Sequence, residues 1–377
     1  MGFRAGFNFN CEKFKKTMEN KKRVCYTVDI NQKEFEFMSI KIIGKDLPNM
    51  PWEDRKGPSD GLPVWRYSAN PIINWNPTPS TARIFNSAVL PYKDGFVGVF
   101  RADSKHINPS LHVGYSKDAI HWEFEDTPIS WVDEDGNPYN CEIHSYDPRL
   151  IEMEGKYYII WCVDFAGCPT IGLGYTEDFK KFVRLENPFI PFNRNGVLFP
   201  RKVNDKYLML SRPSDSGHTP FGDIFLTESP DLKYWGKHRL VMKSGLNWWQ
   251  ETKIGAGPAP IETDKGWLML YHGVITNCNG YVYSFGAALL DKDEPSKVLL
   301  RTEDYILTPQ ENYETNGFVP NVCFPCATLC DAKTGRIAIY YGAADTYTAL
   351  AFTTIDELYE FMLTHNKLGK GDSEAVK

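Results

Sequence analysis

Short apolar strands separated by polar turns recur five times along the chain. In each copy a turn of small or polar residues joins two runs rich in aromatic and β-branched residues, as a β-hairpin requires. The five turns are Lys93-Asp94-Gly95, Glu154-Gly155-Lys156, Asn204-Asp205-Lys206, Asp264-Lys265-Gly266 and Lys333-Thr334-Gly335. The strands predicted after them are Phe96–Arg101, Tyr157–Val163, Tyr207–Arg212, Trp267–His272 and Ile337–Gly342. A spacing of roughly 50–70 residues is typical of a four-stranded propeller blade.

Most copies continue with a third strand, a polar turn and an outer strand, as in Gly114-Tyr115-Ser116-Lys117-Asp118 followed by Trp122. The order of these elements repeats together with the hairpins. A β-sandwich with accidental similarity would not require such a repeat. The sequence therefore predicts an all-β fold, a five-bladed β-propeller.

The two ends of the chain lie outside the repeat. Residues 1–65 are expected to be an N-terminal extension, with a short helix at Glu12–Asn20, that packs on the propeller or on a neighbouring subunit. We place the propeller at residues 66–362 and a tail at 363–377. Ile355–His365 has helical spacing and an acidic start, which predicts a short C-terminal helix. The extension favours a homo-oligomer.

Composition and charge exclude several classes of protein. The net charge is −6, and no block of Lys or Arg suggests a nucleic acid or a membrane surface as partner. No apolar run approaches the roughly 18 residues of a membrane span, and the N-terminus lacks the apolar core of a secretory signal. The nine cysteines are an odd number, which favours reduced thiols and a cytoplasmic protein. Cys323-Phe324-Pro325-Cys326 lacks a partner pair, and the eight His lack ligand spacing, so no metal and no bound cofactor are expected.

Candidate chemistry lies on the strands that line the propeller channel and at the ends of the strands beside them. Because ligands of propellers bind at one mouth of this channel, polar residues in these apolar strands are candidates for a site. The cations among them are Arg101, Arg194, Arg212, Lys253 and, when protonated, His272, and the carboxylates are Asp147 and Asp345. A chain of net charge −6 that gathers cations in one pocket is expected to hold an anion, and Arg suits phosphate.

The single clear acid points to a particular reaction. Glycoside hydrolysis takes two carboxylates, and Asp147 in an apolar strand is the candidate proton donor. Asp345 is either the second carboxylate or an acceptor for sugar hydroxyls. If inorganic phosphate is the nucleophile, no base is needed, because phosphate is already an anion. One acid beside a group of cations is therefore what phosphorolysis requires.

The chain resembles the inverting mannoside phosphorylases of glycoside hydrolase family 130, from about Leu62 to Phe361. The resemblance is carried by segments that together are highly specific. They are Phe85-Asn86-Ser87-Ala88, Phe100-Arg101-Ala102-Asp103, Ser145-Tyr146-Asp147-Pro148-Arg149, Asn193–Lys202, Leu210–Asp215, Lys253–Gly257, Tyr271-His272-Gly273 and Tyr341–Thr346. Within this family the chain looks most similar to the 4-O-β-D-mannosyl-D-glucose phosphorylases.

The resemblance implies a five-bladed propeller and a role for each site residue. Asp147 is implied to donate the proton through the mannosyl 3-hydroxyl. The residues implied to hold the mannosyl ring are Asn86, Ser87, Arg101, Tyr146 and Asp345. The residues implied to bind phosphate are Arg194, Asn195, Arg212, Lys253, His272 and Tyr283.

The predicted reaction is phosphorolysis of 4-O-β-D-mannosyl-D-glucose to α-D-mannose 1-phosphate and D-glucose, in β-mannan catabolism. A phosphorylase of β-1,4-manno-oligosaccharides and a β-mannoside hydrolase on the same fold are the alternatives. A glycan-binding propeller without catalysis is the third. The sequence leaves the acceptor sugar open, although the loops Lys105–Pro109 and Ser214–Gly222 are expected to shape its subsite.

Overall fold

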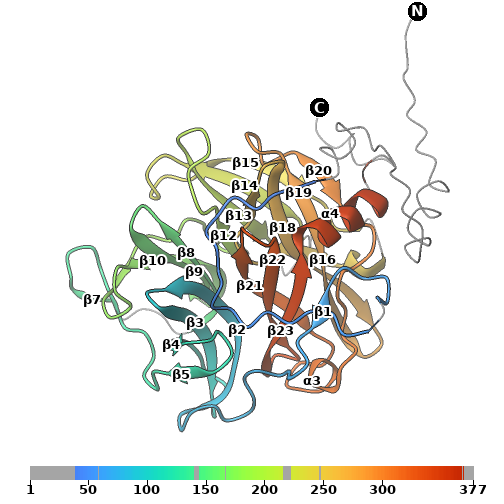
Figure 1. The fold of residues 1–377 in the computed structure, drawn as a ribbon. Helices are drawn as coiled ribbons and strands as arrows, with labels where there is room; N and C mark the ends of the chain where they lie inside the picture. The colour runs from blue at the N-terminus through green and yellow to red at the C-terminus, as the bar shows by residue number, and fades with distance from the viewer. Residues whose placement is uncertain are drawn as a thin grey trace, which may run out of the picture. The chain divides into compact units, whose positions relative to one another are not determined.

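The computed structural model describes residues 39–57, 59–139, 144–165, 167–214, 222–245, 248–366 and 368. From Ile40 onward these residues form five β-sheets placed around a common centre (Figure 1). The five sheets confirm the predicted five-bladed β-propeller. The expected helix at Glu12–Asn20 lies outside the described residues.

The first three blades follow one another along the chain, although the two outermost strands of blade two precede its innermost strand in the sequence. Blade one runs outward through β2 (Thr81–Tyr92), β3 (Gly95–Ser104), β4 (Pro109–Ser116) and β5 (Trp122–Phe124). Blade two runs through β8 (Ser145–Met153), β9 (Lys156–Phe165), β10 (Cys168–Thr176), β11 (Phe182–Arg184), β6 (Trp131–Val132) and β7 (Pro138–Tyr139). Blade three runs through β12 (Asn193–Leu198), β13 (Tyr207–Pro213), β14 (Ile224–Ser229) and β15 (Gly236–Met242).

The last two blades complete the ring. Blade four has β16 (Lys253–Ala256) and β17 (Ile261–Thr263) on β18 (Gly266–Asn277), then β19 (Gly280–Leu290) and β20 (Val298–Arg301). Blade five runs outward through β21 (Cys323–Asp331), β22 (Arg336–Ala343), β23 (Tyr347–Thr354) and β1 (Trp65–Arg66). All five predicted hairpin turns join the first and second strands of a blade or, in blade four, β17 and β18.

The N-terminal strand β1 closes the ring, because it pairs with β23 as the outermost strand of blade five. Arg66 of this strand donates two hydrogen bonds, of 2.7 and 2.8 Å, to the buried carboxylate of Glu314. Glu314 belongs to the short helix α3 (Asn312–Thr315). Two strands far apart in the sequence thus pair in one blade, where blue β1 lies beside red β23 in Figure 1.

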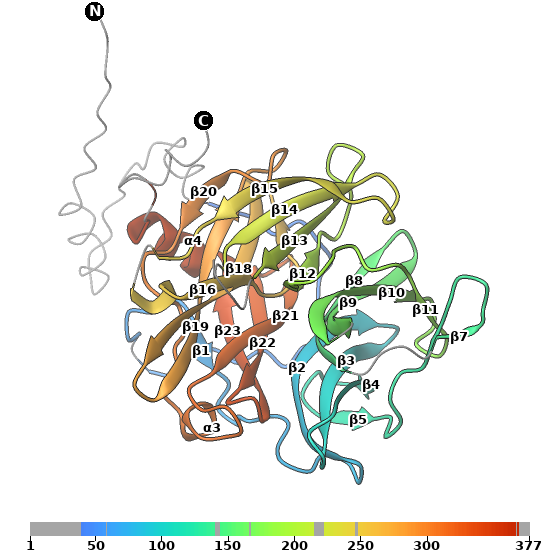
Figure 2. The same cartoon turned by 180° about the vertical axis from the view of Figure 1, so that it is seen from behind.

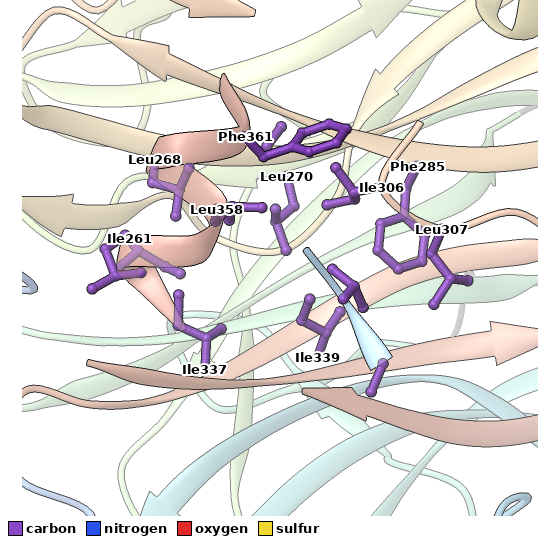
Figure 3. Packing of buried hydrophobic residues seen from close by; sticks show 14 of the residues in the cluster. Ile261, Leu268, Leu270, Phe285, Ile306, Leu307, Ile337, Ile339, Leu358 and Phe361 are labelled. Atoms are coloured by element: carbon purple, nitrogen blue, oxygen red, sulfur yellow. The ribbon is translucent and has the colours of Figure 1, made fainter. Parts of the chain in front are cut away.

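The core lies between neighbouring blades, not on one face of each sheet. In β9, Ile159 and Trp161 pack towards blade one, whereas Tyr158 and Ile160 pack towards blade three. Because both faces of a blade are buried, its strands read as continuous apolar runs without polar alternation. The cluster between blades four and five also takes in the C-terminal helix α4 (Ile355–Thr364), as Figure 3 shows.

Helix α4 confirms the expected C-terminal helix. Its first turn is capped by Thr354, whose hydroxyl accepts a hydrogen bond from the Glu357 amide. Leu358 and Met362, one turn apart, face the core and are fully buried. None of the described helices has the length and apolar character of a membrane span.

The described residues that precede β1 lie along the propeller. Ile42 pairs with Thr263 of blade four, and Leu47 donates its amide to Asp331 of blade five. Ile42 and Leu47 are buried among the side chains of the inter-blade clusters. Figure 2 shows the blades from the opposite side.

Candidate active site

The predicted site residues come together around one cavity of about 360 Å³. All of them except Ser87 line it. The lining residues are Asn86, Arg101, Tyr146, Asp147, Arg194, Asn195, Arg212, Lys253, His272, Tyr281, Tyr283, Val319, Val322, Phe324 and Asp345. Ser87 follows Asn86 on β2 and is fully buried. All five blades therefore contribute to the cavity.

Three of these residues occupy equivalent bulges in the innermost strands of blades one to three. Asn86, Asp147 and Asn195 each stand where the register with the second strand shifts. Each has a left-handed backbone, with φ of 50°, 53° and 53° respectively. Asn and Asp tolerate this conformation better than other non-glycine residues. A bulge re-aims a side chain, and here it turns three polar side chains of apolar strands into the cavity.

Asp147 is held by two donors from blade one. Asn86 Nδ2 lies 2.7 Å and Arg101 Nη1 lies 3.1 Å from Asp147 Oδ1. Both bonds reach the same oxygen, so Oδ2 takes part in neither. The geometry thus orients one oxygen of Asp147 and leaves the other for a ligand, as a proton donor requires.

Asp345 is the second carboxylate of the cavity. It lies in the turn after β22, where Ala344 and Asp345 both have positive φ, of 49° and 46°. Burial raises the pKa of Asp345 to about 6, and the negative charge of Asp147 adds to this effect while Arg101 opposes it. The cavity therefore contains a carboxyl group that takes up a proton near neutral pH.

Three cations from blades three and four gather without a carboxylate between them. Arg194, Arg212 and Lys253 line the cavity, and in the described part of the chain none of them forms a salt bridge. Burial, together with the charges of Arg212 and Arg194, lowers the pKa of Lys253 to about 8. Burial also lowers the pKa of Arg212. Cations that are buried and mutually repelling favour an anionic ligand, which would relieve both costs.

His272 extends this cluster as a neutral donor. Burial lowers its pKa well below the usual value, and the charges of Arg212, Arg149 and Lys253 lower it further. Arg212 Nη1 lies 3.0 Å from His272 Nε2. Since Arg212 can only donate, Nε2 accepts and the ring proton is carried by Nδ1. His272 Nδ1 is buried and has no partner within the described residues, so it is free to donate to a ligand.

Further buried polar atoms of the site lack hydrogen-bond partners within the described chain. They are Asn86 Oδ1, Ser87 Oγ, Asn195 Oδ1 and Arg212 Nε. A buried polar group without a partner costs about 1–3 kcal/mol. Their concentration at one cavity fits a polar ligand with many oxygen atoms, such as a sugar and an oxyanion. For the part of the chain described, no cluster of His, Cys, Asp or Glu suits a metal ion.

Two glycines make room for these side chains. A Cβ atom at Gly255 would lie 2.5 Å from His272 Cε1 and 2.8 Å from Asn195 Oδ1. A Cβ atom at Gly342 would collide with the Asn86 side chain. Both positions therefore require glycine for the site to keep its geometry.

The apolar wall of the cavity was not predicted from the sequence. Tyr281, Val319, Val322 and Phe324 line it, and the Phe324 and His272 rings lie 4.6 Å apart. Val319 belongs to a loop, and the other three lie in apolar or aromatic runs that also occur elsewhere in the chain. No local pattern distinguishes them from core residues.

A second cavity of about 420 Å³ adjoins the first and shares Arg101, Tyr146 and Arg194 with it. Ile107 and Pro109, from one of the loops expected to shape the acceptor subsite, line this second cavity. His144 and Asp164 also line it, and His144 Nδ1 lies 2.9 Å from Asp164 Oδ2. The other expected loop, Ser214–Gly222, falls mostly outside the described residues.

Comparison with known proteins identifies the family. The sequence profile of glycoside hydrolase family 130, described as beta-1,4-mannooligosaccharide phosphorylase, matches residues 45–364. The chain belongs to glycoside hydrolase family 130. The family expected from the resemblance is thereby confirmed.

Two curated relatives within this family differ in their similarity. The chain is 54% identical to a beta-1,4-mannooligosaccharide phosphorylase of Ruminococcus albus, over 88% of this chain and all of the relative. It is 27% identical to a 4-O-beta-D-mannosyl-D-glucose phosphorylase of Bacteroides fragilis, over 83% of this chain and 84% of the relative. The narrower expectation, similarity chiefly to the mannosylglucose enzymes, is not favoured by these values.

A solved structure supports the fold. The beta-1,2-mannobiose phosphorylase of Listeria innocua, in complex with beta-1,2-mannobiose, superimposes with a TM-score of 0.71 at 26% identity. The superposition covers 80% of this chain and 99% of that one.

Proposed function

We propose that the protein is a mannoside phosphorylase that transfers the terminal mannosyl unit of β-1,4-linked manno-oligosaccharides to inorganic phosphate. The observation that carries this proposal is the carboxylate-free cluster of Arg194, Arg212 and Lys253 beside Asp147. A hydrolase of this kind needs a base to activate water, whereas phosphate arrives as an anion and needs cations.

The proposed step exchanges one bond at the anomeric carbon. A phosphate oxygen forms a bond to C1 while the bond from C1 to the leaving sugar oxygen breaks, which inverts a β-linkage to α-mannose 1-phosphate. Asp147 supplies the proton to the leaving oxygen through the mannosyl 3-hydroxyl. Since two donors hold Oδ1 of Asp147, Oδ2 is the oxygen that carries this proton.

The other residues act by position and charge. Arg194, Arg212, Lys253, Asn195, His272 and Tyr283 bind phosphate. Burial raises the pKa of Tyr283 to about 12, so its hydroxyl remains a donor. Asn86, Ser87, Arg101, Tyr146 and Asp345 hold the mannosyl ring. Fixed donors that are already oriented towards the incoming oxyanion lower the barrier without reorganisation in the transition state.

Two observations support manno-oligosaccharides as the substrate. The 54% identity to the Ruminococcus albus enzyme is twice that to the Bacteroides fragilis mannosylglucose enzyme. The second cavity adjoins the first at Arg101 and Tyr146, and it offers space for further sugar units of a leaving chain. Phosphorolysis of mannosylglucose, the reaction first expected from the sequence, is the second candidate.

The substrate is tested by comparing β-1,4-mannobiose, β-1,4-mannotriose and 4-O-β-D-mannosyl-D-glucose under saturating phosphate. We expect kcat/KM for the manno-oligosaccharides to exceed that for mannosylglucose by about tenfold or more, equivalent to roughly 1.4 kcal/mol. A higher kcat/KM for mannosylglucose would instead establish the second candidate.

A further inference from the structure

Two further charged residues, Arg83 and Asp103, extend the ion pairs of Arg101 away from the cavity that contains Asp147. Arg101 Nε lies 3.1 Å from Asp103 Oδ1, and Arg83 Nη2 lies 2.8 Å from Asp103 Oδ2. Arg101 also reaches Asp147 through Nη1 at 3.1 Å. A continuous series of ion pairs therefore connects Arg83, Asp103 and Arg101 with Asp147, the proposed proton donor.

The pairing of β2 with β3 brings Arg83, Arg101 and Asp103 together. Arg101 and Asp103 are two residues apart on β3, so their side chains lie on the same face. Arg83 of β2 is the direct partner of Asp103 in the strand register. The three side chains therefore meet as a cross-strand cluster that the pairing of β2 with β3 determines.

Asp103 and Arg83, the two residues farthest from Asp147 in this network, are both buried. Asp103 is 1% exposed and Arg83 is 4% exposed. The Arg83 guanidinium also lies 3.8 Å from the centre of the Phe318 ring. Neither residue lines the cavity that contains Asp147, although Asp103 lines the second cavity together with Arg101. An effect of either residue on the Asp147 carboxyl group would therefore pass through Arg101.

Arg101 and Arg83 lie among three carboxyl groups. The negative charges of Asp147, Asp345 and Asp103 act on Arg101, and Arg83 pairs with Asp103. Burial raises the pKa of Asp345 to about 6, and the negative charges of Asp147 and Asp103 add to this effect, while Arg101 and Arg83 oppose it.

Other titratable or charged groups surround Asp147, but within the described residues none of them forms a hydrogen bond or ion pair with its carboxyl group. The titratable or charged ones are Tyr146 and Arg149 on β8, Cys162 on β9, Arg194 on β12, Tyr283 on β19, Cys326 on β21 and Asp345 after β22. Arg149 bonds the backbone oxygen of Asp147, not its carboxyl group. Arg101 is the cation that contacts the carboxyl group, and Asp103 is its other partner.

We propose that the buried Arg83–Asp103 pair is a positioning device that holds Arg101 against Asp147 while sharing its positive charge, so that Asp147 keeps the proton the reaction needs. Arg101 alone would favour the ionised carboxylate, which cannot act as an acid. Asp103 offsets that effect, and Arg83 limits how far it does so. This inference rests on the proposed role of Asp147 as proton donor.

The sign of the effect follows from the charges. Asp103→Asn removes a negative charge, so Arg101 holds Asp147 more strongly as a carboxylate and the proton is lost at lower pH. We expect the alkaline limb of the pH profile of kcat, measured at saturating phosphate and disaccharide, to shift to lower pH by about one unit. Arg83→Gln removes a positive charge beside Asp103, so Asp103 offsets more of the positive charge of Arg101. The alkaline limb of the kcat profile is then expected to shift to higher pH.

Opposite shifts separate positioning by charge from a structural role. Arg83→Lys keeps the charge and is expected to retain the wild-type limb, and the KM for phosphate is expected to stay within about twofold in all three variants. Thermal unfolding, followed by circular dichroism, checks that each variant is folded. Equal losses of activity at every pH with an unmoved limb, or shifts of the same sign in Asp103→Asn and Arg83→Gln, would overturn the inference. A wild-type enzyme that cleaves no β-mannoside would instead refute the proposed function.

Discussion

At the scale of single residues, the proposed reaction requires two groups of the cavity, Asp147 and Lys253, to hold a proton. Asp147 must hold a proton to act as an acid, whereas Lys253 must hold one to remain a cation. The charges around each residue affect whether it holds its proton. Asp147 lies between Arg101 and further carboxyl groups, and Lys253 lies among cations that lower its pKa to about 8. Phosphate binding is therefore expected to weaken on the alkaline side, where Lys253 loses its proton.

Lys253 leads to a prediction about phosphate affinity. Because the neutral amine prevails above its pKa of about 8, the KM for phosphate is expected to rise as the pH increases from about 7 to about 9. Lys253→Met is expected to raise the KM at pH 7 by roughly tenfold to a hundredfold, since a hydrogen bond to a charged group contributes about 1.5–3 kcal/mol. The pH dependence in this range is expected to flatten in the same variant.

Initial rates over a range of phosphate concentrations, at several pH values, measure this effect. Lys117→Met is a matched control, because Lys117 is an exposed lysine on blade one whose ion pair, with Asp94, is exposed as well. A wild-type KM for phosphate that does not change across this pH range would contradict the placement of Lys253 at the phosphate.

At the scale of elements, the strand bulges determine which side chains of the innermost strands point into the cavity. Asn86, Asp147 and Asn195 leave the regular pleat at equivalent places in three innermost strands. The sequence pointed to these positions, because Asn and Asp are unusual in buried strands. It did not reveal the bond between Asn86 and Asp147, since these residues belong to different blades and no local pattern links them.

The close packing of His272 and Asn195 against Gly255 leads to a prediction at this scale. A methyl group there would contact His272 and Asn195, both on the proposed phosphate side, so Gly255→Ala is expected to raise the KM for phosphate by about tenfold. The KM for the disaccharide is expected to change by less than about twofold.

Gly236→Ala in β15 is the control, because a Cβ atom at Gly236 meets nothing within 4 Å. Steady-state kinetics with each substrate varied in turn compare the two variants. If Gly255→Ala kept the wild-type KM for phosphate, or if both variants weakened it equally, the close packing of His272 would not be needed for phosphate binding.

At the scale of the whole molecule, the five-fold repeat explains why much of the fold was readable from sequence. Hairpins such as Lys93-Asp94-Gly95 are local, so each turn and its two strands were predicted correctly. The closing strand β1 was not, because Trp65–Arg66 is too short for a period-two pattern and its partner β23 lies near the other end of the chain. The Arg83–Asp103 pair was likewise visible only as two polar residues at strand ends.

The distribution of charge over the molecule connects the fold with the proposed reaction. The chain carries a net charge of −6, yet four cations and two carboxyl groups line the central cavity. Blades three and four contribute Arg194, Arg212 and Lys253, whereas Asp147 and Asp345 come from blades two and five. In the proposed reaction, the cations that bind phosphate and the acid that delivers the proton thus come from different blades.

The most direct test of this account is to follow β-1,4-mannobiose by proton and phosphorus NMR, with and without inorganic phosphate. We predict that α-mannose 1-phosphate is the first product, that it forms only with phosphate, and that Asp147→Asn forms it at least about a thousandfold more slowly. Release of free mannose at the same rate without phosphate, or formation of the β-phosphate, would contradict the account.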